Sequence, residues 1–175
     1  SFNLLQPLDH ASGQDENDIN IDFGAVLQVT DSDGDTAVAG GAFIVTVDDD
    51  TPVASGTSIA VTVDEDGLTG GNAGGIGDVA GQATSASGNL GAIFSVGADN
   101  GNVSYGFNAN LAPLTALNLT SGGVALTYSI NMAGDTLTAS AGLTSVFTLT
   151  IDTVTGAYSF NLLQPLDHAS GQDEN

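Results

Sequence analysis

The sequence predicts an all-β protein built as an antiparallel β-sandwich. Apolar and polar residues alternate along most segments, these segments are rich in Val, Thr, Ile, Phe and Tyr, and Gly-containing turns separate them. Alternation with a period of two places one set of side chains on each face of a strand. The 24 glycines and the shortness of the segments favour antiparallel strands joined by tight turns.

Eight segments are expected to form strands because their β-branched and aromatic residues suit a pleated, half-buried surface. In chain order they are 19–30, 41–47, 58–63, 103–107, 124–130, 136–140, 146–152 and 157–163. The expected turns are DNGN (99–102), SGG (121–123), MAGD (132–135) and VTG (154–156). No segment carries a helical stripe, and one short helical turn is expected in PLDHASGQDEN.

A segment of 17 residues, SFNLLQPLDHASGQDEN, occurs twice, at 1–17 and 158 residues later at 159–175. We call it the repeated segment. Identity at a fixed period indicates a tandem array, so the residues that follow a further copy should read as 18–53 do. The alternative, a duplicated chain end, also needs a parent sequence in which the segment recurs.

The array divides the chain into parts of two repeat units. A strand is followed by three Asp residues and by Pro52, and the residue before a proline favours an extended backbone. We expect 1–50 to be the C-terminal strands of a preceding unit, 51–57 to be an acidic linker, and 58–175 to be most of the next unit. Both copies of the repeated segment should occupy the same position in a sandwich, so 159–175 is expected to pair with the second unit.

The charge of the chain excludes several classes of protein. It has 21 Asp and Glu residues and no Lys or Arg, which gives a formal net charge of −21. Nucleic acid binding requires cationic side chains that neutralise phosphates, so no nucleic acid partner is expected.

No apolar run approaches the roughly 18 residues of a membrane-spanning helix, so no membrane insertion is expected. The chain has no cysteine, which excludes disulfides and thiolate metal sites. A cross-link between segments would have to be a hard cation bound by oxygen ligands.

The motif DSDGD predicts a Ca²⁺ site. It places Asp31, Asp33 and Asp35 at alternate positions of a Gly-containing turn between two strands. Crowded carboxylates repel one another unless a cation lies among them, and Ca²⁺ accepts six to eight oxygen ligands in flexible geometry. The spacing is not that of an EF-hand, because Gly stands fourth instead of sixth and Ala42 stands at the twelfth position. The alternative is a solvated acidic turn.

Two further acidic clusters lie one strand apart, and we expect them to bind Ca²⁺ and to stiffen the junction between units. The candidate ligands are Asp48, Asp49, Asp50, Asp64, Glu65 and Asp66. Two alternatives remain open. The first cluster can be a solvated linker, and the second can lie at the far end of its strand and bind an ion of its own.

The repeated segment contributes Asp9, His10, Asp15 and Glu16, of which Asp15 and Glu16 are also candidate Ca²⁺ ligands. A single His without a second His or Cys is weak evidence for Zn²⁺. A Ca²⁺-stabilised loop or a capping turn is the better interpretation. The sequence pattern offers no general base that could activate a Ser nucleophile. We therefore expect neither an enzyme nor a small-molecule substrate.

Four motifs together resemble the long tandem repeats of giant bacterial RTX adhesins, which are exported by type I secretion. They are VDEDGLTGG, SGGVALTYSI, TGAYSFNLLQPLDHASGQDEN and VTDSDGDTAVAGGAFIVTVDDDTPVA. The resemblance implies an immunoglobulin-like sandwich that serves as an extender on the bacterial cell surface. It also implies that Ca²⁺ rigidifies the domains and linkers, and that many copies hold a ligand-binding tip away from the cell.

Two alternatives to the extender remain open. One is a filament subunit that donates residues 18–47 to the next subunit by strand addition. In an isolated chain these residues are expected to dock onto a neighbour or to fold back as a circular permutant. The other is a glycan- or ice-binding module, which needs an exposed aromatic or Thr-rich flat face. The 6% aromatic content and the lack of Trp weigh against the glycan version.

Overall fold

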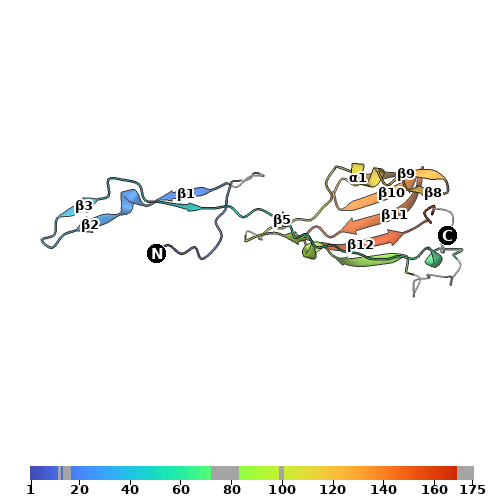
Figure 1. Ribbon diagram of the computed structural model, residues 1–175, viewed down its shortest axis with the longest axis horizontal. Helices are drawn as coiled ribbons and strands as arrows, with labels where there is room; N and C mark the ends of the chain where they lie inside the picture. The colour runs from blue at the N-terminus through green and yellow to red at the C-terminus, as the bar shows by residue number, and fades with distance from the viewer. Residues whose placement is uncertain (12, 14–16, 72–82, 99–100, 169–175) are drawn as a thin grey trace. The chain divides into compact units, whose positions relative to one another are not determined.

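The computed structural model describes residues 1–11, 13, 17–71, 83–98 and 101–168 (Figure 1). In these residues the protein is all-β, with antiparallel sheets and a single α-helix of four residues. The chain forms two compact units, the first from 1–53 with 95–102 and the second from 54–94 with 103–175. The described residues include no helix with the length and apolar character needed to cross a membrane.

The first unit contains two separate two-stranded sheets. β1 (Ile19–Asp22) pairs with β4 (Ile44–Val47), and β2 (Gln28–Thr30) pairs with β3 (Thr36–Val38). The expected strand 19–30 is therefore two strands separated by the 3₁₀ turn η1 (Gly24–Val26).

The side chain of Asp22 explains this interruption. Its Oδ1 accepts hydrogen bonds from the amides of Gly24 at 2.8 Å and Phe43 at 2.9 Å. A Cβ at Gly24 would lie 2.2 Å from the carbonyl oxygen of Gly41, so only glycine fits at this close backbone approach.

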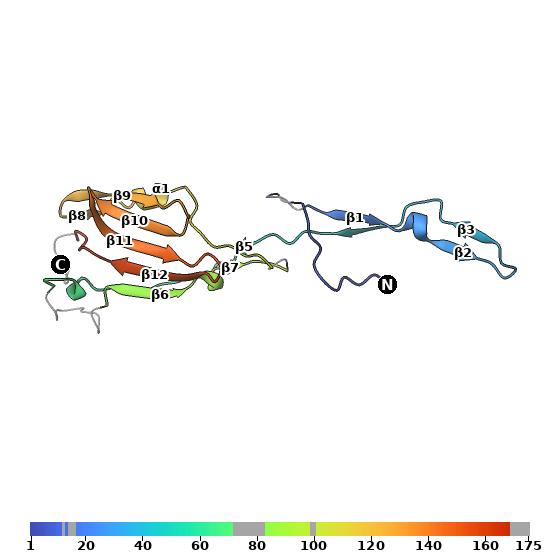
Figure 2. The same cartoon turned by 180° about the vertical axis from the view of Figure 1, so that it is seen from behind.

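The second unit is dominated by one six-stranded antiparallel sheet with the strand order β6-β12-β11-β10-β9-β8 (Figure 2). Its strands are β6 (Ser85–Asn89), β8 (Thr120–Ser121), β9 (Val124–Ile130), β10 (Thr136–Ala141), β11 (Thr144–Ile151) and β12 (Ala157–Leu162). The remaining elements are the pair β5 (Val53–Ala54) and β7 (Phe94–Ser95), the 3₁₀ turns η2 (Glu65–Gly67) and η3 (Leu90–Ala92), and the helix α1 (Ala112–Thr115). The expected strands 124–130, 136–140, 146–152 and 157–163 are thereby confirmed.

The two faces of this sheet differ in chemistry, as the alternating sequence predicts. In register across β10, β11 and β12, the apolar face presents Leu137, Leu149 and Phe160, and the polar face presents Thr138, Thr148 and Asn161. Water can solvate the polar face, whereas the apolar face has to be covered.

A β-bulge on β11 adds one residue to the apolar face. Ala139 pairs with Phe147 but Ser140 pairs with Ser145, so Val146 has no partner on β10. Its carbonyl instead accepts the amides of Leu163 and Gln164. Val146 is fully buried and forms the core cluster with Leu126 and Ala139. Half-buried side chains pack against this cluster, namely Leu119, Tyr128, Ala141, Phe147 and Leu166.

Some expectations about secondary structure were wrong. Residues 58–63 and 103–107 form no strand, although both alternate. β6, with the sequence SASGN, forms one although it has few strand-favouring residues. The reason is tertiary, because β6 lies against the edge of β12, where backbone pairing is available. The described residues of PLDHASGQDEN contain no helical turn in either copy.

The two copies of the repeated segment adopt different structures. In the second copy, residues 159–162 belong to β12 and pair with β11 and β6. In the first copy, residues 1–5 form no strand. Because the residues are identical, the difference comes from the neighbouring strands and not from local propensity.

Candidate metal centre

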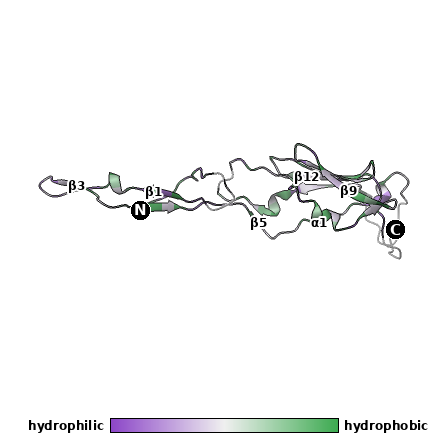
Figure 3. Ribbon diagram, turned by 90° about the horizontal axis from the view of Figure 1, so that it is seen from above, coloured by the Kyte–Doolittle hydropathy of each residue, from purple (hydrophilic) through white to green (hydrophobic). Residues whose placement is uncertain are grey.

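The carboxylates of DSDGD lie in the turn of the β2–β3 hairpin, which Figure 3 colours as hydrophilic. One oxygen from each of Asp31, Asp33 and Asp35 lies within 4.8 Å of the others, and all three side chains are exposed. Among the described residues, no other group of three His, Cys, Asp or Glu side chains converges in this way. The structure therefore brings together the three residues that the spacing predicted.

Asp31 organises this turn. Its Oδ1 accepts hydrogen bonds from the amides of Asp33 at 3.3 Å, Gly34 at 3.1 Å and Asp35 at 2.9 Å. Gly34 has a φ of +99°, which favours glycine. Hydrogen bonds with the Asp33 side chain and with the Asp35 amide lower the pKa of Asp31 below its usual value of 3.8. The turn therefore favours the charged form of Asp31 and holds the three carboxylates close together.

This donor set fits a hard cation. Oδ1 of Asp31 is engaged by amides, which leaves its other oxygen and the carboxylates of Asp33 and Asp35 as ligands. Oxygen ligands in an exposed loop suit Ca²⁺, which completes its shell with water, better than Zn²⁺, which prefers His and Cys.

The linker cluster is held by backbone contacts. The amide of Asp50 donates to Asp49 Oδ1 at 2.9 Å, and Asp50 Oδ2 accepts from the amide of Ala98 at 2.7 Å. Asp48 is exposed. These three carboxylates do not converge on one point. Ala98, which the sequence did not connect with this cluster, is thus hydrogen-bonded to it.

The second acidic cluster forms the 3₁₀ turn η2. Asp64 Oδ1 caps this turn by accepting from the amide of Asp66 at 2.9 Å, and Glu65 accepts from the amide of Leu166 at 2.7 Å and contacts His168 at 3.3 Å. Asp64 Oδ2 is buried and has no hydrogen-bond partner among the described residues. This oxygen is an orphan that a cation or a water molecule would satisfy.

The position of this loop bears on whether it stiffens a junction. The amide of Asp64 bonds to Ala83, just before β6, whereas the amide of Ser55 bonds to Ile93, beyond the other end of β6. The Asp64 loop and the point where the chain enters the second unit therefore lie at opposite ends of β6. This geometry favours the alternative in which the loop binds an ion of its own.

The repeated segment gives less information on metal binding. Asp15 and Glu16 lie outside the described residues, and so do their second copies. Of the described members, His10 contacts the carbonyl of Asn17 at 2.6 Å, and Asp9 is exposed.

In the second copy, Asp167 has a structural role that the sequence did not predict. Its two carboxylate oxygens accept from the amides of Gly122 at 2.9 Å and Gly123 at 2.7 Å. The SGG turn that precedes β9 is the sequence feature that could have indicated this role, because the backbone amides of such a turn need a hydrogen-bond acceptor. Asp152 shapes its own hairpin turn by accepting hydrogen bonds from the amides of Val154 and Thr155.

Comparison with known proteins found no match, whether among family models, curated proteins or solved structures.

Proposed function

We propose that this chain is a structural spacer repeat of a large secreted bacterial surface adhesin, extracellular and stiffened by Ca²⁺. In this proposal its fold is an immunoglobulin-like sandwich, and many copies in tandem project a ligand-binding tip from the cell. The neighbouring partners are identical repeats, and the protein is not an enzyme.

The observation that carries the proposal is the complete identity of residues 1–17 and 159–175. The two copies differ in structure according to whether partner strands surround them, which is what a window onto a tandem array produces. Repeats of this kind bury their hydrophobic faces by contact with neighbours, so they suit an extended stalk.

The charge supports a role for cations. With 21 acidic residues and no Lys or Arg, the folded chain repels itself unless cations neutralise it. The Asp31, Asp33 and Asp35 cluster fits Ca²⁺, and the orphaned Asp64 oxygen marks a second candidate position. Each bound ion would stabilise the folded state, because the unfolded chain has no preformed site.

The test is thermal unfolding of the full chain, followed by circular dichroism in millimolar Ca²⁺ and again in EGTA. We expect the melting temperature to fall markedly in EGTA. The matched variants are Asp33→Asn, which removes a ligand of the DSDGD turn, and Asp9→Asn, which removes an exposed carboxylate elsewhere. Asp33→Asn should lose part of the Ca²⁺ effect and Asp9→Asn none. An identical melt in both buffers would remove Ca²⁺ stiffening from the proposal.

The polar face of the six-stranded sheet bears on the surface-binding alternative. The residues in register on it are Thr138, Thr148 and Asn161, together with Thr136, Thr150 and Ser159. They include no aromatic ring, so they do not favour glycan binding. The Thr and Ser side chains keep an ice-binding module as a second candidate, and thermal hysteresis of a solution of the full chain tests it.

A further inference from the structure

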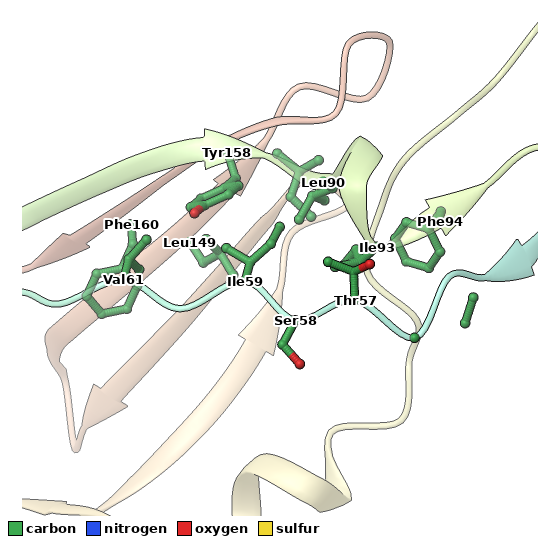
Figure 4. A pocket seen from close by; sticks show the side chains of 13 residues that line it. Thr57, Ser58, Ile59, Val61, Leu90, Ile93, Phe94, Leu149, Tyr158 and Phe160 are labelled. Atoms are coloured by element: carbon green, nitrogen blue, oxygen red, sulfur yellow. The ribbon is translucent and has the colours of Figure 1, made fainter.

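The apolar face of the second unit opens into a groove of about 640 Å³ (Figure 4). One wall is the segment that runs from Ala54 to Val61, and the floor is formed by β11 and β12. The apolar side chains that line it include Ile59, Val61, Leu90, Ile93, Leu149 and Phe160. Val61 is 52% exposed and Ile59 is 38% exposed, so this part of the face is uncovered.

The wall of the groove includes a segment that pairs with no strand among the described residues. Residues 58–63 have the alternating sequence SIAVTV, yet their backbone makes no hydrogen bond within the described part of the chain. Hydrogen bonds at each end fix the segment in place, from Ser55 to Ile93 and from Asp64 to Ala83. An extended segment with free amides and carbonyls beside an apolar groove is a site for strand addition.

The first unit is incomplete in a complementary way. Its strands form only two-stranded sheets, which are marginally stable in water unless they gain a third strand or a packed face. Val47 is its one buried hydrophobic side chain among the described residues. Large apolar side chains stay exposed, namely Val26, Leu27, Val29, Val38, Phe43 and Ile44.

The repeat identifies which segment belongs in the groove. The second copy of the repeated segment lies in the six-stranded sheet through β12, which is also part of the groove floor. In the first copy, the residues that directly follow the repeated segment are 18–47, which hold β1 to β4. β1 and β4 have four residues each, so either can pair along the six residues of 58–63.

We propose that residues 18–47 of a second copy of this chain dock in this groove and pair with residues 58–63. The donated strands cover the apolar face with their exposed side chains and satisfy the free backbone groups of the wall. The proposal deepens the tandem-repeat interpretation and rests on it for the identity of the donor. It does not depend on Ca²⁺ or on adhesion.

Sedimentation velocity of the full chain, from micromolar to millimolar concentration, tests the proposal. We expect concentration-dependent self-association, in Ca²⁺ and in EGTA alike, and stronger in high salt because each copy carries a charge of −21. Hydrogen exchange should show amides of 58–63 that exchange quickly in dilute solution and slowly in the associated state. A full chain that stays monomeric at every concentration overturns the proposal, whatever Ca²⁺ does to its stability.

Three matched variants locate the contact. Val61→Thr alters the groove and Ile44→Thr alters the donor. Leu143→Thr is the control, because Leu143 is a fully exposed side chain in the β10–β11 turn. Each variant places the β-branched, uncharged residue Thr at its position. We expect the first two to weaken association by about tenfold each and the control to leave it unchanged. Equal association of all three variants contradicts the assigned contact.

A longer chain supplies the donor within one molecule. Residues 18–53 are appended after Asn175, in the order that the repeat predicts, and the control carries the same residues in scrambled order. The native order should abolish self-association through this groove and raise the melting temperature, and the scrambled order should do neither. If the two chains associate and melt alike, the donor is not residues 18–47.

Discussion

At the scale of single residues, backbone amides take the part that Lys and Arg take in most proteins. Asp31 accepts three amides of its own turn, and Asp167 accepts two from the SGG turn. These bonds satisfy turn amides and favour the charged carboxylate. Most acidic residues with a described partner therefore shape turns, and the sequence alone does not separate these from metal ligands.

Asp167→Asn should destabilise the second unit near neutral pH, because Asn offers one acceptor oxygen for two amides. Hydrogen bonds from the Thr120 side chain and from the Gly123 and Gly122 amides lower the pKa of Asp167 below 3.8. A lowered folded-state pKa means that the stabilisation is present above 3.8 and is lost as the pH falls through the lowered value. The melting temperature of the variant should be a few degrees lower at pH 7 and equal to that of the natural protein in strong acid.

The control for this prediction is built into the chain. Asp9 has the same local sequence as Asp167, but within the described residues it accepts no hydrogen bond like those that Asp167 accepts from Gly122 and Gly123. Asp9→Asn should leave the melting temperature unchanged at every pH. A constant difference between Asp167→Asn and the natural protein from neutral to strongly acid pH would show that the carboxylate charge contributes nothing.

At the scale of elements, an alternating segment forms a strand where a neighbouring strand is available for backbone hydrogen bonding. β9 to β12 follow one another through short turns, so local sequence was enough to predict them. Residues 58–63 alternate equally well but pair with no strand in the part of the chain that the structure describes. β6 is the opposite case: its sequence favours a strand only weakly, yet it forms one because it pairs with the edge of β12.

The bulge on β11 gives a prediction for this sheet. Val146 is fully buried, so Val146→Ala leaves a cavity and should lower the free energy of unfolding by roughly 2 kcal/mol. The matched variant Val154→Ala, at a side chain that is 75% exposed, should change it by less than about 0.5 kcal/mol. Urea denaturation of the full chain measures both. Similar losses for the two variants would mean that Val146 does not anchor the core.

At the scale of the whole molecule, the charge acts on stability through every acidic group at once. A net charge of −21 with no Lys or Arg makes self-repulsion the dominant electrostatic term. Salt shortens the range of this repulsion from about 8 Å at physiological ionic strength to about 3 Å at 1 M.

Added salt should therefore raise the melting temperature of the chain in EGTA. Screening does not depend on the identity of the monovalent cation, so NaCl and choline chloride should act equally. A scanning calorimeter gives both melting temperatures under matched conditions. A rise with NaCl alone would point to specific cation binding and not to screening.

The amino-acid sequence was enough to predict the all-β character, the strands β9 to β12, the repeat and the DSDGD cluster. Each depends on residues that are close in the chain, where a period of two or a fixed spacing sets geometry directly. Three features depend on the tertiary structure: Asp167 caps a turn, Asp64 and Ser55 lie at opposite ends of β6, and 58–63 pairs with no strand among the described residues. These depend on which distant strands are available, and one sequence, SFNL, is a strand at 159–162 and not at 1–4 for that reason.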